Sequence, residues 1–100
     1  MSEAGVSMTE PGVLRLAGVL DYRSGPALRK EGKALIAACR ESKLVLDCSS
    51  VAKSSSVGLS LLLGFIRDAQ AAGKGWELRG MPDDMRDIAG VYDLDEVLAG

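Results

Sequence analysis

The side chains that could carry chemistry in this chain are few, and the most conspicuous are three consecutive serines, Ser54, Ser55 and Ser56. The sequence contains no histidine, which is the usual general base for a serine nucleophile and the usual neutral metal ligand. Neither glycine-rich phosphate-binding motif occurs, whether GxGxxG or GxxxxGK followed by serine or threonine. We therefore expect a protein that is not an enzyme and that binds no cofactor and no metal.

Two clusters of carboxylates are the remaining candidates for acid–base catalysis. They are Asp83-Asp84 and Asp93-Asp95-Glu96. Both lie among polar residues, whereas catalytic carboxyl groups usually need an apolar or like-charged pocket to tune them. We expect both clusters to be exposed and to have no catalytic role.

The bulk composition narrows the partners and the compartment. The chain has 12 basic and 14 acidic residues and no long run of either sign, which argues against a nucleic-acid groove and a polybasic membrane anchor. Its N-terminus lacks the basic flank and apolar core of a signal peptide. The most apolar run, 57–66, is about half the ~20 residues that a membrane-spanning helix needs. These features predict a cytoplasmic protein.

The two cysteines, Cys39 and Cys48, lie inside apolar stretches without the spacing of a metal site. Such cysteines usually pack as small hydrophobic side chains. We expect both to be buried free thiols, which suits a reducing cytoplasm.

Hydrophobic periodicity predicts alternating strands and helices within one domain that spans residues 1–100. The predicted strands are 6–8, 13–20, 44–48 and 76–79, and the predicted helices begin near Ser24, near Ser56 and near Asp83. The first helix would run to about 41–42, with Arg29, Lys30 and Lys33 on its solvated side, and the second to about Ala72, with Gly73 as its stop. Alternation of this kind requires right-handed crossovers between parallel strands, so the pattern predicts a small α/β sandwich.

The triple serine falls at the turn between the predicted central strand and the second helix, where α/β sheets commonly expose ligand and partner sites. Ser56 or Ser55 could simply be the helix N-cap, which stabilises a helix by about 1 kcal/mol. Alternatively, a serine here offers a contact or regulatory hydroxyl, and a phosphate added to it would meet the helix dipole favourably. The two roles are compatible, and spacing alone leaves both open.

Two segments of the sequence resemble the core signature of STAS domains. The first is Leu44-Val45-Leu46-Asp47-Cys48-Ser49-Ser50-Val51 with the following Ser54-Ser55-Ser56-Val57-Gly58-Leu59 and its leucine run, and the second is Gly18-Val19-Leu20-Asp21. The resemblance extends over nearly the whole chain. It implies a small mixed β-sheet with α-helices packed mainly on one face, and a non-enzymatic module that docks onto another protein.

Within the family, the chain looks most like the MlaB subfamily, the cytoplasmic STAS subunit of ABC transporters that move phospholipids and maintain outer-membrane lipid asymmetry. The resemblance rests on the short solitary form, the leucine run 59–63, the Ala71-Ala72-Gly73-Lys74 segment and the ending 91–98. It implies a transporter ATPase as partner, and through it the permease, and a location at the inner membrane through that partner. The implied contacts are the helix from Asp83 and the turn residues Ser54, Ser55, Ser56, Val57 and Ser60.

The resemblance also includes the anti-sigma factor antagonists, which implies an alternative function and an anti-sigma factor kinase as the alternative partner. Ser56 matches the serine that is phosphorylated in those antagonists. Ser55 stands where the family usually has aspartate, and Lys53-Ser54 replaces a pair that is more often apolar. Because the aspartate normally accompanies the phospho-acceptor, the sequence favours docking at Ser56 over phosphorylation.

Overall fold

The computed structural model describes residues 4–54 and 56–91, which form a four-stranded sheet and three helices in the predicted order. The elements are β1 (Gly5–Glu10), β2 (Val13–Leu20), α1 (Gly25–Ala38), β3 (Lys43–Ser54), α2 (Ser56–Ala71), β4 (Gly75–Arg79) and α3 (Asp83–Val91).

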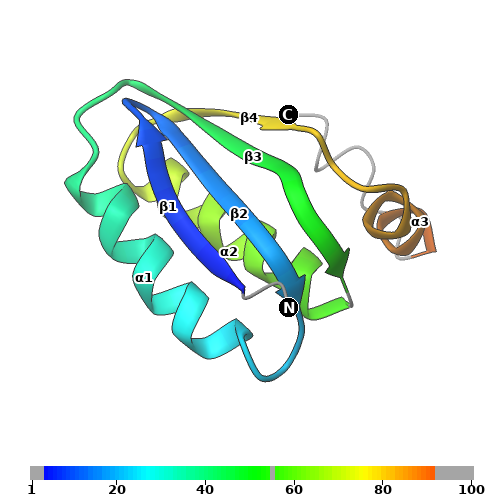
Figure 1. The fold of residues 1–100 in the computed structure, drawn as a ribbon. Coiled ribbons are helices and arrows are strands. Elements are labelled where there is room, and N and C mark those ends of the chain that lie inside the picture. Colours follow the sequence, from blue (N-terminus) through cyan, green and yellow to red (C-terminus); the bar gives the residue numbers. More distant parts are fainter. Residues whose placement is uncertain (1–3, 55, 92–100) are drawn as a thin grey trace.

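The sheet is mixed, with the strand order β1-β2-β3-β4 (Figure 1). β1 and β2 form an antiparallel hairpin, whereas β2, β3 and β4 run parallel. The parallel part needs crossover helices, and α1 and α2 supply them. The predicted mixed α/β architecture is therefore confirmed.

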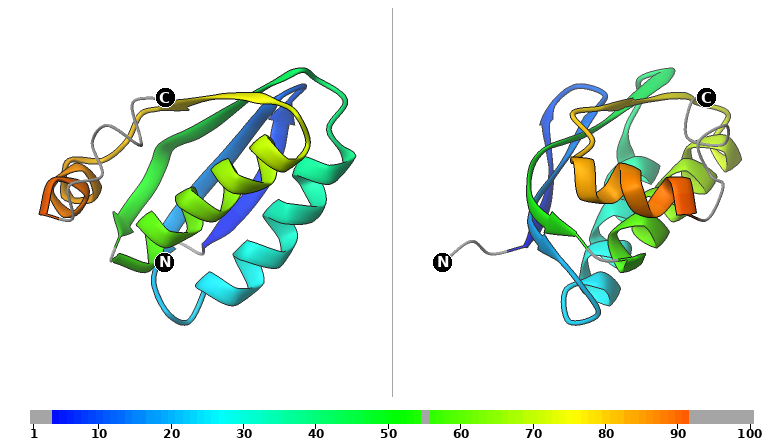
Figure 2. Two further views of the ribbon diagram at one scale, coloured as in Figure 1. Left: turned by 180° about the vertical axis from the view of Figure 1, so that it is seen from behind. Right: turned by 90° about the vertical axis from the view of Figure 1, so that its right-hand side faces the viewer.

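Helices α1 and α2 cover one face of the sheet, as the left view of Figure 2 shows. The core lies between these helices and the alternating leucines of the inner strands, and its largest fully buried side chains include Leu14, Leu16, Leu20, Ile36, Leu44, Leu46, Leu62 and Phe65. Helix α3 lies beyond the end of β3, where it contacts α2 and β3 and buries Met85 (Figure 1).

Helix α1, strand β3 and the side chain of Arg29 differ from what the sequence predicts. α1 ends at Ala38, a few residues earlier than predicted. β3 continues past residue 48 to Ser54, because it pairs with β2 as far as Leu20 despite two irregularities in register. The prediction that Arg29 lies on the solvated side of α1 is wrong, since it is half-buried and forms an ion pair with Asp68 of α2.

The predicted end of α2 is confirmed to within one residue, and the prediction for the two cysteines is confirmed in part. α2 ends at Ala71, and Gly73 follows with a positive φ of 72°. Both cysteines are free thiols, but only Cys48 is fully buried and Cys39 is partly exposed. The cluster 93–96 lies outside the described residues. No helix in the described part of the chain is long and apolar enough to cross a membrane.

Candidate functional site

The turn that carries the serines lies at the carboxyl edge of two parallel strands. Leu20, the last residue of β2, pairs with Ser54, the last residue of β3. The β2–α1 turn and the β3–α2 turn therefore emerge side by side at one end of the sheet (Figure 1). Two segments more than 30 residues apart in sequence thus share one surface.

The described serines of α2 form a small exposed face. Ser56 is the first residue of the helix and Ser60 lies one helical turn later, and both side chains are exposed. Val57, between them, is half-buried and lies where a side chain on Gly25 of α1 would collide with it. Because Ser56 is already helical, a capping residue must precede it. The prediction that Ser55 fills this role falls outside the described residues.

The neighbouring β2–α1 turn is fixed by Asp21. Its Oδ1 accepts hydrogen bonds from the backbone N–H groups of Arg23 and Ser24, at 2.9 and 3.3 Å. The Ser24 hydroxyl, in turn, donates to the Val19 carbonyl rather than capping α1. The segment Gly18-Val19-Leu20-Asp21 thus has a local structural role, since Asp21 closes the turn that leads into α1.

Tyr22 projects from this turn with 72% of its surface exposed. Its ring lies 5.6 Å from the guanidinium of Arg23, which also donates to the Tyr22 hydroxyl. No sequence motif marks Tyr22, so the sequence alone does not indicate a role for it. The parallel pairing of β2 with β3 could have indicated that the residue after Asp21 lies near the serine turn.

Asp47 of β3 is a buried acid that is only 4% exposed. Its Oδ1 accepts from the Ser49 hydroxyl at 2.7 Å and from the Ser49 backbone N–H at 3.0 Å, and Arg15 lies 3.6 Å away on β2. The Ser49 hydrogen bonds, more than Arg15, hold the pKa of Asp47 below its ordinary value of 3.8. Asp47 is therefore an ionised structural carboxylate within β3, where it accepts hydrogen bonds from Ser49 of the same strand.

The thiol of Cys48 is buried and unreactive. Desolvation, and secondarily the charge of Asp47, raises the pKa of Cys48 to about 12. A thiol of this kind stays protonated and is a poor nucleophile.

A model of the family described as "Mlab, STAS domain" matches residues 6–99. The chain belongs to the STAS domain family. Solved STAS structures have the same fold. The anti-sigma factor antagonist SpoIIAA in its unphosphorylated form is 20% identical, with 94% of this chain and 84% of that chain covered at a TM-score of 0.72. An anti-sigma factor antagonist from Mycobacterium paratuberculosis is 24% identical, with 98% and 83% covered at a TM-score of 0.75.

The phosphorylated form of the Bacillus cell fate determinant SpoIIAA is also similar, with 21% identity, 98% and 89% covered and a TM-score of 0.67. At these identities the likeness concerns the fold. STAS domains generally bind partner proteins, which directs attention to exposed surfaces. In this chain α2, which carries the exposed Ser56 and Ser60, contacts α3. α3 exposes Asp83, Asp84 and Asp87, so the predicted exposure of the first acidic cluster is confirmed.

Proposed function

We propose that this chain is the non-catalytic STAS subunit of an ABC transporter that moves phospholipids and maintains outer-membrane lipid asymmetry. It docks onto the cytoplasmic ATPase through the segment 54–60 and α3, and stays at the inner membrane through that partner. The observation that carries the proposal is the exposed face of Ser56 and Ser60 at the start of α2. The family model with the MlaB description supports the choice of partner.

Small hydroxyl side chains suit such an interface because they allow another backbone to approach closely. Removal of a single hydroxyl changes the binding free energy only a little, whereas a charge that is buried without a partner costs several kcal/mol. The two kinds of substitution at Ser56 should therefore differ. We expect Ser56→Ala to bind nearly normally and Ser56→Glu to lose the ATPase.

The experiment is a capture of bound proteins from the native cells with the tagged full chain, followed by mass spectrometry. We expect an ABC ATPase in stoichiometric amount with the wild-type chain and with Ser56→Ala, and a loss of at least tenfold with Ser56→Glu. Ser42→Glu is the matched control, since Ser42 is also exposed but precedes β3 at the other end of the sheet. An ATPase that co-purifies fully with Ser56→Glu would contradict the proposed docking face.

The second candidate function is an anti-sigma factor antagonist switched by phosphorylation of Ser56. The exposed position of Ser56 in the first turn of α2 favours it, because a kinase can reach the hydroxyl and the helix dipole stabilises the added charge. Phosphate mapping separates the two candidates. Stoichiometric phosphoserine at position 56 together with capture of a serine kinase would replace the transporter proposal.

A further inference from the structure

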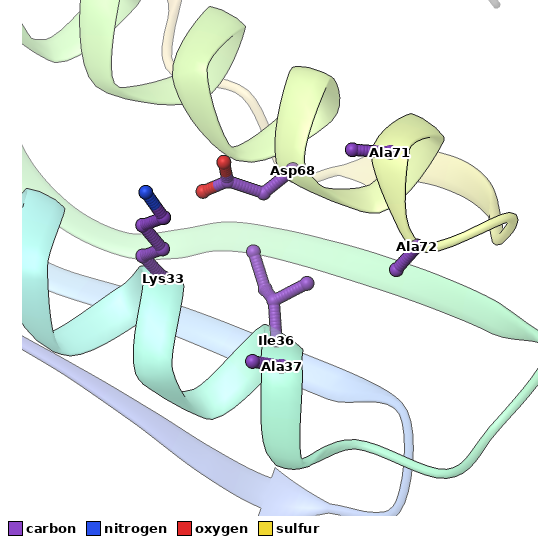
Figure 3. Close-up of a pocket in the computed structure, with 6 residues that line it drawn as sticks. All are labelled: Lys33, Ile36, Ala37, Asp68, Ala71 and Ala72. Carbon is purple, nitrogen blue, oxygen red and sulfur yellow. The ribbon is translucent and has the colours of Figure 1, made fainter.

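The surface of the α1–α2 pair carries two neighbouring hollows, because Arg29 of the first is ion-paired with Asp68 of the second. The first, of about 320 Å³, is lined by Arg29, Ser60, Leu63, Gly64 and Arg67. The second, of about 240 Å³, is lined by Lys33, Ile36, Ala37, Asp68, Ala71 and Ala72 (Figure 3). Ser60 lines the first hollow, so the groove that the two hollows make begins at the exposed face of Ser56 and Ser60.

Arg29 is held in a defined position in the first hollow. Its two terminal nitrogens donate to the two carboxylate oxygens of Asp68, one of them at 3.1 Å, and its guanidinium carbon lies 5.7 Å from the centre of the Phe65 ring. Gly64 leaves the space that the arginine fills, because a Cβ at that position would overlap Arg29 Nε. An arginine fixed in this way loses little conformational entropy when it binds another group.

The charge of the groove is positive. Asp68 is 14% exposed and already paired with Arg29, and Figure 3 shows Lys33 pointing toward the same carboxylate. Arg67 is exposed and forms no ion pair with any residue between 4 and 54 or between 56 and 91. Arg29 keeps N–H donors that Asp68 does not use, since a guanidinium has five. The groove therefore presents two arginines and one lysine against one carboxylate.

We infer that the first hollow is the anchoring point for an acidic segment of the partner protein, with a partner carboxylate bound between Arg29 and Arg67. Arginine binds carboxylates in bidentate geometry, and Leu63 and Gly64 offer an apolar floor for the methylene groups of a glutamate or aspartate. The residues of α2 that line the hollow lie in the helix interior, where backbone N–H groups are used within the helix. Such a site lacks the free N–H groups that usually hold a phosphate. The identity of the partner as the transporter ATPase rests on the proposed function.

A cross-linking experiment tests this inference with the full chain in its own cells. Arg67→Lys keeps the positive charge and places an amine at the hollow, and a water-soluble carbodiimide then joins that amine to an activated carboxylate in contact with it, with loss of water to the reagent. We expect a covalent link from residue 67 to a partner aspartate or glutamate, mapped by mass spectrometry. Arg40→Lys is the control, because Arg40 is exposed but follows the carboxyl end of α1.

A second measurement uses the captured partner directly. Arg67→Glu should weaken its binding at least tenfold and flatten the dependence of Kd on salt, while Arg40→Glu should change Kd less than twofold. Replacing the cross-linked partner carboxylate by arginine should restore binding to Arg67→Glu. Unchanged melting temperatures for both variants would show that the change in Kd does not result from unfolding.

The outcomes separate this inference from the proposed function. An ATPase that is captured but linked only through other lysines leaves the proposed function intact and overturns the hollow as an anchor. A link from residue 67 to a carboxylate of a different protein supports the anchor and overturns the ATPase as partner. Failure of any link from residue 67 would overturn the inference. Chemical-shift changes at Arg29 and Arg67 with inorganic phosphate, but not with a peptide that carries the partner carboxylate, would also overturn it and would show a phosphate site instead.

Discussion

Helices α1 and α2 contain one region that is closely packed and another that is exposed to solvent. In their middle the helices approach so closely that a Cβ on Gly32 would overlap the Phe65 ring, and the fully buried Phe65 lies beside the Arg29–Asp68 ion pair. At the start of α2, only a short distance along the same helix, Ser56 and Ser60 face solvent.

This contrast indicates that different parts of the two helices determine the stability of the fold and the binding of a partner. The close contact in the middle is intolerant of any change in volume, because protein interiors are packed like crystals. The start of α2 can vary its exposed side chains with little effect on folding, because they contact few other residues. Substitutions in the first region should therefore change the free energy of unfolding, and substitutions in the second should change binding.

The largest expected effect is at Phe65. Phe65→Ala removes a fully buried ring from between the two helices and leaves a cavity, so we expect a loss of about 3–5 kcal/mol in the free energy of unfolding. That is a large part of the 5–15 kcal/mol typical of a domain. Urea denaturation followed by circular dichroism measures it. A loss below about 1 kcal/mol would show that the helices are not packed as closely as described.

The contact at Gly32 gives the next largest effect. Gly32→Ala forces a methyl group into the Phe65 ring, and overpacking of this kind costs about 1–3 kcal/mol, partly offset by the better helix propensity of alanine. Gly64→Ala is the comparison variant, since its methyl group would overlap the Arg29 side chain and disturb the ion pair with Asp68, but would not enter a fully buried ring. We expect Gly64→Ala to lower the free energy of unfolding less than Gly32→Ala does, because part of the Arg29 side chain can move toward solvent. Equal destabilisation by both variants would remove the distinction between the two glycines.

A smaller effect concerns the charge of Asp47. Its folded pKa is lowered below 3.8, so the ionised form stabilises the fold above that pH, and this contribution is lost as the pH falls through the lower folded value. Asp47→Asn keeps the shape but replaces charge-assisted hydrogen bonds from Ser49, and we expect a loss of about 1 kcal/mol at pH 7.

The measurement is the free energy of unfolding of both proteins between pH 7 and pH 2. The difference between wild type and Asp47→Asn should be constant near neutrality and should shrink below about pH 4. Ser49→Ala should reduce the same difference, because Ser49 supplies the hydrogen bonds that lower the pKa. A difference that persists unchanged at pH 2 would exclude the carboxylate as its source.

The sequence was sufficient for the order of elements and for the parallel part of the sheet, because leucine periodicity and turn residues such as Gly73 act locally. It was also sufficient to locate the serine turn. The true length of β3 was not predictable, since residues 49–54 are mostly polar and are strand only because β2 pairs with them. Tertiary pairing here overrides the local pattern.

Residues that act through long-range contacts are not predictable from the sequence for the same reason. The sequence predicts Arg29 on the solvated side of its helix, because charged helical residues usually lie there, and only the approach of α2 places Asp68 against it. Tyr22 carried no signal of its own. It becomes notable because the last residue of β2 lies next to Ser54 in the sheet.

The smallest expected effect on folding, and the sharpest test of the contrast, is at Tyr22. Tyr22→Ala removes a ring that is 72% exposed, so the free energy of unfolding should change by less than about 0.5 kcal/mol. If the docking surface includes both turns at this end of the sheet, the same variant should weaken partner binding about tenfold, because exposed aromatic side chains often supply much of the binding free energy. Tyr22→Phe keeps the ring and should bind almost normally. Binding that is unaffected by Tyr22→Ala but abolished by Ser56→Glu would confine the docking surface to α2 and exclude the β2–α1 turn from it.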